Sequence, residues 1–385
     1  MLPEGWLATK LGDLVKIWGG VAPAALELRN EGPIPYLKVE DLNNSSKYQS
    51  LSRTYVARAR RLVPADSILF PKRGAAISGN KVRIARVPHL IDSNMMALAA
   101  DPKKMYFEYL YYLILNIGLF RIADTSTIPQ INNKHIEPYS VILPPLAEQK
   151  KIADILSTWD AAMENAEKLL LNAEAHKRAL MQKLLTGRRR LKAFEGREWK
   201  HLKLGSLFQE RLERGGDALP LLSITGSRGV VPQEETDRRD TSREDKSSYK
   251  KICVGDIGYN TMRMWQGVSA WSGLEGLVSP AYTILVPGPH IDPLFASYLF
   301  KLPAQVHWFR RYSQGLTSDT WNLKYKQFAE VPAYVPNLEE QREIGKIISM
   351  AEQAVLLHTT SLEVLGSEKR ALMQQLLSGK RRVTI

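Results

Sequence analysis

Residues 177–187 read KRALMQKLLTG, and residues 369–379, displaced by 192 positions, read KRALMQQLLSG. The same displacement pairs LAEQKKIADILS at residues 146–157 with LEEQREIGKIIS at residues 338–349. Aligned without gaps, residues 146–190 and 338–382 are identical at 19 of 45 positions. An internal duplication of this kind indicates that the fold is built from repeated structural units. The chain therefore consists of two similar halves, each ending in a long helical segment.

Both repeated segments carry the marks of a helix. Pro144, Pro145 and Pro336 precede them, and Glu148 and Glu340 fall in the first turn, where they complement the helix dipole. Apolar residues recur at alternating spacings of three and four, which is typical of a heptad seam. In the first copy these are Ile152, Ile155, Trp159, Ala162, Ala166, Leu169 and Ala173. The second copy reads Ile344, Ile347, Ala351, Ala354, His358, Ser361 and Leu365 and is weaker in the middle, where His358 and Ser361 are polar.

The ends of the two segments also match. Gly187 and Gly379 stand where a helix C-cap is expected, and basic residues follow each glycine at the negative end of the dipole. Two copies of equal length predict a paired, antiparallel coiled coil, although ordinary core packing is the alternative for a single copy. Ser157 with Asp160 could cap a second helix, so each segment is either one helix or two.

The other two segments are rich in short β-type runs broken by glycine and proline. These runs cover residues 34–39, 67–70, 81–87, 219–224, 255–259 and 281–286, with helical stretches near residues 105–120 and 293–311. Trp6 with Lys10-Leu11-Gly12 is matched by Trp199 with Lys203-Leu204-Gly205. We therefore expect an α+β fold: two β-rich globular domains separated by two long α-helices that form an antiparallel coiled coil, in a pseudo-two-fold internal repeat. The expected boundaries are 1–143, 144–190, 191–335 and 336–385.

The composition of the chain indicates which kinds of binding partner and which cellular compartment to expect. A net charge of +13 over 385 residues favours a polyanion. A single cysteine, Cys253, excludes internal disulfides and suits a reducing cytoplasm. The start MLPEGWLATKLGDL is unlike a secretory signal, and no apolar stretch is long enough for a membrane span, so we expect a cytoplasmic protein without a membrane partner. Seven scattered histidines predict no metal site.

Catalytic motifs are missing from the sequence. It contains neither a phosphate-binding GxxxxGK[ST] loop nor a GxGxxG after a strand. The string SPAY at residues 279–282 lacks the amide or carboxylate with which amino-methyltransferases hold their target amine, and it reads as the start of a strand. We expect no catalytic residue and no cofactor in this chain.

Two strings combine basic, amide and aromatic residues with glycine directly after a strand-like run: FPKRGAAI at 70–77 and YNTMRMWQG at 259–267. Arginine can donate two hydrogen bonds to guanine, asparagine and glutamine pair with adenine, and glycine lets the backbone approach phosphate. The candidate DNA contacts are Lys72, Arg73, Gly74, Lys81, Arg83, Asn260, Arg263, Trp265 and Gln266. The alternative for either string alone is a turn with solvated charges. The polar loops TSTIPQINNK at 125–134 and GLTSDTWNLKYK at 315–326 could face DNA as well.

The chain resembles the specificity subunits of type I restriction–modification systems. The resemblance rests on PPLAEQKKI at 144–152, VPNLEEQ at 335–341, KRG at 72–74 and MRMWQG at 262–267, together with the duplication. It implies that each globular domain reads one half of a bipartite, asymmetric site in double-stranded DNA. The helices would fix the gap between the half-sites and dock two modification subunits, with Ile152, Ile155, Trp159, Ile344 and Ile347 as candidate partner contacts.

The resemblance also implies a division of labour. The modification subunits would bind S-adenosylmethionine and methylate adenine, and a restriction subunit would supply ATP-driven translocation and cleavage. This chain would be non-catalytic and would hold no cofactor. The alternatives are a coiled-coil scaffold whose globular ends bind proteins, a standalone DNA-binding protein, or an autonomous enzyme with an unrecognised site.

Overall fold

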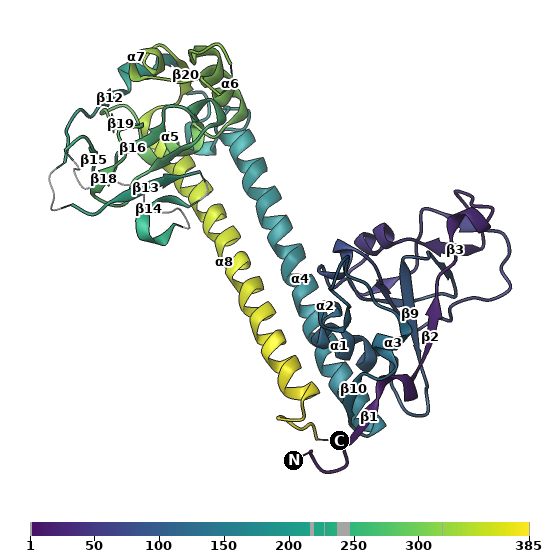
Figure 1. Cartoon of the computed structure of the whole chain (residues 1–385). Coiled ribbons are helices and arrows are strands. Elements are labelled where there is room, and N and C mark those ends of the chain that lie inside the picture. The colour runs from purple at the N-terminus through teal and green to yellow at the C-terminus, as the bar shows by residue number, and fades with distance from the viewer. Residues whose placement is uncertain (1, 216–218, 227, 237–246, 318, 385) are drawn as a thin grey trace. The chain divides into compact units, whose positions relative to one another are not determined.

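The computed structural model describes the chain except for residues 1, 216–218, 227, 237–246, 318 and 385. It divides into two compact units. Unit 1 comprises Met1–Glu167 with Thr360–Ile385, and unit 2 comprises Lys168–Thr359. Each unit contains one of the globular segments expected from the sequence together with parts of both long helices (Figure 1). The four-part division of the chain at residues 143, 190 and 335 stays a prediction.

Unit 1 is built on a five-stranded sheet in the order β2-β9-β6-β7-β4. Neighbouring strands are antiparallel except β4 and β7. A smaller sheet has the order β5-β3-β8, and β1 pairs with β10. The bounds are β1 Leu7–Lys10, β2 Val15–Gly19, β3 Ile34–Leu37, β4 Tyr48–Gln49, β5 Tyr55–Val56, β6 Ile68–Pro71, β7 Arg83–Ala85, β8 Leu90–Ile91, β9 Met95–Ala100 and β10 Ser140–Leu143. The helices of its globular part are α1 Phe107–Ile117, α2 Leu119–Ile122 and α3 Asn133–Ile136.

Unit 2 repeats the centre of this arrangement. Its four-stranded sheet has the order β12-β19-β16-β17, which corresponds to β2-β9-β6-β7, and β11 pairs with β20 as β1 does with β10. Two-stranded sheets β13-β14 and β15-β18 complete it. The bounds are β11 Lys200–Lys203, β12 Phe208–Glu210, β13 Leu222–Thr225, β14 Gly229–Pro232, β15 Lys250–Ile252, β16 Ile257–Asn260, β17 Ser269–Trp271, β18 Gly276–Val278, β19 Tyr282–Pro287 and β20 Pro332–Val335. The short helices are α5 Pro293–Leu299, α6 Pro303–Tyr312 and α7 Tyr325–Phe328.

The two repeated segments are single helices. α4 runs from Leu146 to Leu184 over 39 residues, and α8 from Leu338 to Leu377 over 40 residues, so each is about 60 Å long. Ser157 therefore does not begin a second helix. It lies in the fourth turn of α4, where its hydroxyl accepts a hydrogen bond from Lys47 Nζ at 3.1 Å.

Within each unit, part of α4 packs antiparallel to part of α8, as expected. The predicted seam is wrong in part, since Ala162 is exposed and Leu169 is 52% exposed. In unit 1, Lys369 on α8 donates a hydrogen bond to Asp160 on α4. In unit 2, Lys177 on α4 donates to Glu352 on α8 at 2.6 Å. The two pairs are copies of each other, since 192 positions separate Asp160 from Glu352 and Lys177 from Lys369.

The basic residues after each helix act through ion pairs, which the dipole argument did not foresee. Gly187 and Gly379 have the positive φ of a C-cap, 68° and 73°, as expected. Arg382 then places Nε and Nη2 at 2.8 and 3.0 Å from the buried carboxylate of Glu148, and Arg190 makes the same pair with Glu340 at 2.8 Å. The end of α8 thus closes unit 1 and the end of α4 closes unit 2.

The glutamine that follows each buried glutamate fixes the corner between the last strand and the long helix. Gln149 accepts a hydrogen bond from the backbone of Tyr106 and donates to the carbonyls of Lys104 and Pro144. Gln341 does the same with Asp292, His290 and Pro336. The repeated EQ pair therefore attaches each long helix to the globular part of its own unit.

Candidate DNA interface

In unit 1, residues 72–74 follow the C-terminal end of β6, a central strand of the sheet. Two other segments hold them in place. The backbone N–H of Lys72 donates to Asn94 at 2.8 Å, and its carbonyl accepts from Ile131 at 2.9 Å. Gly74 donates to Pro129 at 2.8 Å. Residues 72–74, 92–94 and 124–131 thus form one surface, which we name the three-loop edge of unit 1.

Unit 2 has the same arrangement after β16. Thr261 donates through its backbone and its hydroxyl to Ala281, at 3.2 and 2.8 Å, and its carbonyl accepts from Leu323 at 2.8 Å. Gln314 and Asn322 exchange two backbone hydrogen bonds of 2.8 Å at the base of a hairpin, as Asp124 and Gln130 do in unit 1. Residues 260–263, 279–281 and 314–323, apart from 318, form the three-loop edge of unit 2.

The middle segment of each edge is a turn capped by a side chain. Asp92 accepts from the N–H of Asn94 at 2.7 Å, and Ser279 accepts from Ala281 at 3.4 Å. β19 begins directly afterwards at Tyr282, so SPAY is a strand start as predicted. Sequence reasoning missed residues 92–94. The signal was an Asp-x-Asn turn directly before an apolar strand.

The predicted DNA contacts of unit 1 divide into two groups. Arg73 is exposed, and Gly74 adopts φ 74°, a conformation that favours glycine. Lys81 donates a hydrogen bond to Asn43. Arg83 is half-buried on β7, where its guanidinium donates to the carbonyls of Ser45 and Val82 and burial lowers its pKa. These internal bonds give Arg83 a structural role, and its DNA contact stays a prediction.

In unit 2, two predicted residues hold the turn and two face outward. Asn260 accepts from the backbone of Met262 at 3.0 Å, and Trp265 Nε1 donates to the carbonyl of the same residue at 3.0 Å. Arg263 and Gln266 are exposed. The Trp265 ring meets Trp321 of the hairpin edge to face at 5.3 Å, and Arg310 lies 5.1 Å above Trp321. An aromatic and cationic cluster therefore ties the turn to the hairpin.

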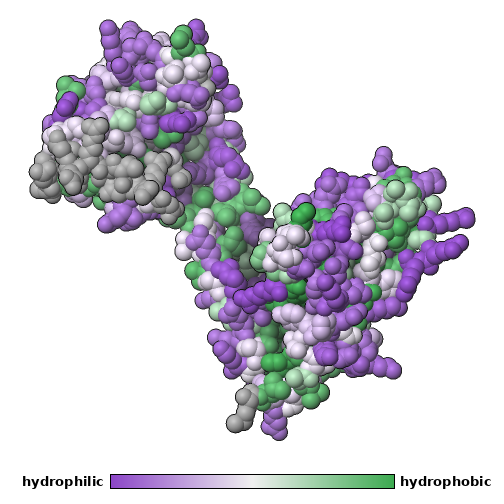
Figure 2. All heavy atoms as spheres, viewed as in Figure 1, coloured by the Kyte–Doolittle hydropathy of each residue, from purple (hydrophilic) through white to green (hydrophobic). Residues whose placement is uncertain are grey.

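Each hairpin carries a large apolar side chain in solvent. Ile128 in unit 1 is 69% exposed, and Leu316 in unit 2 is 101% exposed. Apolar side chains of this kind can contact the methyl group of thymine. Both loops are polar in overall sequence, and neither residue was predicted as a DNA contact. Hydrophilic residues dominate the visible surface of each unit, with apolar residues between them (Figure 2).

The structure corrects part of the predicted partner surface on the long helices. Ile152 and Ile344 are 0% and 1% exposed and belong to the cores of unit 1 and unit 2. Their side chains fasten each helix to its own globular part, so they are not available to another protein. Ile155, Trp159 and Ile347 are half-buried.

Other kinds of site find no support in the described part of the chain. It contains no group of three or more histidine, cysteine, aspartate or glutamate residues placed to hold a metal ion. Among the described residues, no helix combines the length and the apolar character needed to cross a bilayer.

Two globular parts with matching loop edges, each packed on a pair of antiparallel helices, define an internally duplicated protein. Comparison with known proteins gives the family. Residues 3–173 match the family model described as type I restriction modification DNA specificity domain. Residues 3–173 thus form a domain of this family, and nearly the whole chain is similar to proteins named type I restriction enzyme specificity subunits.

Individual relatives align with this chain over most of their length. The chain is 24% identical to the type I restriction enzyme MjaVIII specificity subunit of Methanocaldococcus jannaschii, covering 99% of this chain and 94% of that subunit. It is 22% identical to the EcoBI specificity subunit of Escherichia coli, over 89% and 78% of the two chains. The crystal structure of a type I S subunit from M. genitalium superposes with a TM-score of 0.60 at 17% identity, over 98% of this chain and 97% of that one. The HsdS subunit of Thermoanaerobacter tengcongensis gives a TM-score of 0.51 at 15% identity, over 99% and 98%.

Proposed function

We propose that each three-loop edge reads one half of a bipartite site in double-stranded DNA, while α4 and α8 set the distance between the half-sites and dock two modification subunits. One observation carries the proposal: the two edges share their backbone hydrogen bonds but not their side chains. Lys72 and Thr261 occupy equivalent places, as do Asn94 and Ala281. A common frame with different side chains is suited to reading two different short sequences.

The chemistry of the edges fits duplex DNA. Exposed Arg73 and Arg263 can each donate a bidentate pair of hydrogen bonds to guanine, and Gln266 can pair with adenine. The net charge of +13 supplies attraction to the phosphate backbone. Ile128 and Leu316 add apolar contacts at the hairpins. The edges thus offer direct base contacts, and the remaining basic surface offers phosphate contacts.

Partner docking is assigned to the long helices. Several of their apolar side chains are exposed, among them Leu171, Met350 and Leu356 at 62%, 69% and 65%. The half-buried Ile155, Trp159 and Ile347 border the globular parts and remain candidates for the same contact. The modification subunits would bind S-adenosylmethionine and methylate adenine, and the restriction subunit would use ATP; this chain would need no cofactor. Such a complex would work in the cytoplasm.

The test starts from methylome sequencing of a host that expresses this chain with its modification subunits, which defines the site and its spacer. Binding of the complex is then measured by fluorescence anisotropy on duplexes altered in one half-site. Arg73→Ala should weaken binding by about 1–3 kcal/mol, or about 5- to 150-fold, and relax the base preference of one half-site only. Arg263→Ala should do the same for the other half-site, so each variant is the control for the other. Lys103→Ala, at the opposite end of β9 from the edge, should leave both preferences unchanged.

The alternatives give different results. Equal losses on specific and random DNA would make both arginines phosphate contacts. A complex whose formation does not weaken with rising salt, and which contains protein alone, would favour the coiled-coil scaffold. Methyl transfer by the isolated chain would favour an autonomous enzyme.

A further inference from the structure

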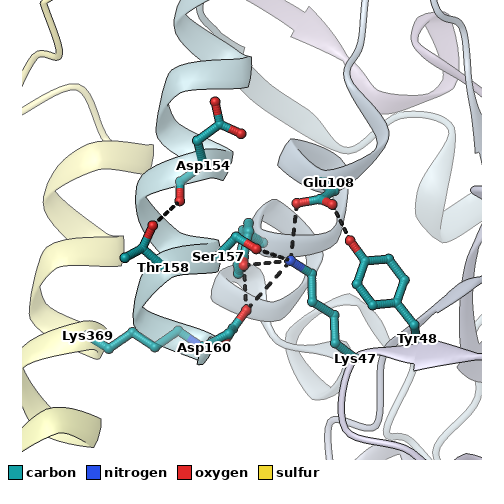
Figure 3. Close-up of polar contacts among 9 residues, drawn as sticks. Lys47, Tyr48, Glu108, Asp154, Ser157, Thr158, Asp160 and Lys369 are labelled. Atoms are coloured by element: carbon teal, nitrogen blue, oxygen red, sulfur yellow. Dashed lines mark hydrogen bonds and ion pairs between the residues drawn. The ribbon is translucent and has the colours of Figure 1, made fainter. Parts of the chain in front are cut away.

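In unit 1, a buried polar network joins the globular part to both long helices. Tyr112 on α1 donates its hydroxyl hydrogen to Asp160 on α4, and Lys369 on α8 donates to the same carboxylate. Lys47 Nζ donates to the Tyr112 hydroxyl at 2.9 Å and to Glu108 and Ser157 at 3.1 Å (Figure 3). One carboxylate therefore receives hydrogen bonds from the globular part and from the other long helix.

Unit 2 repeats the tyrosine, carboxylate and lysine of this network with the two long helices exchanged. Tyr298 on α5 donates to Glu352 on α8 at 2.8 Å, and Lys177 on α4 donates to the other oxygen at 2.6 Å. Glu352 and Lys369 are the copies of Asp160 and Lys177 at the displacement of 192. We name each tyrosine–carboxylate–lysine set a joint.

The hydrogen bonds of each joint restrict the orientation of the globular part relative to the long helices. Tyr112 is fully buried and Tyr298 is 3% exposed. Burial raises the pKa of both phenols, so each remains a neutral donor toward its carboxylate. Apolar packing alone would hold the same surfaces together, but it tolerates sliding and rotation. The lysine and carboxylate of each joint are partly exposed, at 16% and 25% for Lys369 and Asp160 and 25% and 46% for Lys177 and Glu352. The hydrogen bond from the buried phenol, with its directional geometry, is therefore the contact that selects one register.

The unit 1 joint is connected to its three-loop edge. Asn80, which closes the turn after residues 72–77, donates to the carbonyl of Leu115 at 3.0 Å and accepts from the N–H of Leu119 at 3.0 Å. Leu115 lies on α1, three residues after Tyr112, and α2 leads into the hairpin of the edge. A rotation of α1 about the long helices would therefore carry two of the three loops with it.

From this geometry we infer that the two joints set the direction in which each globular part presents its edge, and so define the spacer length that the complex accepts. The inference rests on the proposed function. Tyr112, Asp160 and Lys369, with Tyr298, Glu352 and Lys177, act as positioning residues. One base pair more or less in the spacer moves a half-site by about 3.4 Å and turns it by about 35°, a change that rigid joints reject and loosened joints accept.

The experiment uses the complex with its modification subunits and the variants Tyr112→Phe and Tyr298→Phe, alone and combined. Tyr109→Phe is the matched control: Tyr109 lies on the same helix, is equally buried, and its hydroxyl has no hydrogen-bond partner among the described residues. Competition binding compares the natural spacer with spacers one base pair shorter and longer. The preference for the natural spacer should fall at least about fivefold in the joint variants and stay unchanged in Tyr109→Phe.

Half-site preference should be unchanged in every variant, which separates this test from that of the proposed function. If the unaltered complex shows no half-site preference, the proposed function fails. If it shows half-site and spacer preference and the joint variants keep both, the joint inference alone is wrong. Asp160→Asn keeps an acceptor for Tyr112 but removes the ion pair with Lys369. If the phenylalanine variants do not fold, this variant is used for the same binding comparison. A retained spacer preference in that variant also counts against the inference.

Discussion

Arg190 is the last of three consecutive arginines, yet replacing it with alanine should destabilise unit 2 far more than replacing Arg188 or Arg189. Both neighbours are exposed, whereas Arg190 is half-buried. Its guanidinium makes two hydrogen bonds of 2.8 Å to Glu340 and donates to the carbonyls of Phe194 and Arg197 at 2.8 and 2.7 Å. The variant Arg190→Ala removes all four.

The size of the expected destabilisation follows from Glu340, which loses its counterion. Glu340 is 0% exposed, so the variant leaves a buried carboxylate without its counterion, which costs about 3–5 kcal/mol. For a unit of this size each kcal/mol lowers the melting temperature by about 2–4 °C, so the expected fall is about 6–20 °C. Arg188→Ala and Arg189→Ala should change stability by about 0.5 kcal/mol or less. Arg382→Ala should cost less than Arg190→Ala, because Trp6 still donates to Glu148 at 3.0 Å.

The assay must separate the units, because two compact units need not unfold together. Hydrogen exchange by mass spectrometry along a thermal ramp reports on peptides of unit 2 and unit 1 separately. Arg190→Ala should expose unit 2 peptides first, and adding Glu340→Gln should recover part of the loss by removing the buried charge. Equal melting of Arg190→Ala and Arg189→Ala would refute the assignment of Arg190 as the counterion.

Three further outcomes are expected. Gly12→Ala should cost about 1–3 kcal/mol in urea unfolding, because an added Cβ would lie 2.9 Å from the backbone of Glu137, whereas Gly19→Ala has open space and should be nearly neutral. Burial lowers the pKa of His89 below its ordinary 6.5, so the unfolded chain binds the proton more readily and unit 1 should lose stability as pH falls through 6.5; His89→Asn should reduce the difference in urea midpoint between about pH 7.5 and about pH 5.5. A seven-residue insertion into α4 alone should weaken assembly with the modification subunits, measured by co-purification, while matched insertions into α4 and α8 should restore it and lengthen the recognised spacer.

The helices could be predicted from the sequence because their signals are local. Prolines mark the starts, glycines with positive φ mark the ends, and the seam repeats at heptad spacing. The continuity of α4 through Ser157 could not be predicted in this way. A serine followed three residues later by an acidic residue is also a cap signal. What decides the matter is tertiary: Ser157 and Asp160 bind Lys47, Tyr112 and Lys369, which come from distant parts of the chain.

The candidate site could likewise be predicted where its signals are local in sequence, but not where they depend on tertiary structure. Residues 72–74 and 260–266 stand out because charged and amide residues follow an apolar strand next to glycine. Arg83 looked equivalent to Arg73 in sequence, but the register of β7 with β6 turns it toward the carbonyl of Ser45. Residues 92–94 were missed because their place beside Lys72 comes from sheet pairing. Register and sheet order, which bring these segments together, are not local properties.

The displacement of 192 is constant along the helices, whereas the equivalent tyrosines of the globular parts, Tyr112 and Tyr298, are 186 positions apart. The contacts give the physical reason. Each joint and each arginine–glutamate pair uses one residue from or next to α4 and one from or next to α8. Asp160 and Lys177 are 17 residues apart, and so are Glu352 and Lys369. A change of length in one helix would therefore break pairs that the other helix still presents. The hairpins at the edges differ in length, 124–130 against 314–322, and each is closed at its base by a pair of backbone hydrogen bonds that any loop length beyond them can satisfy. A fold of this kind holds its helices to one length and leaves its loops free to vary.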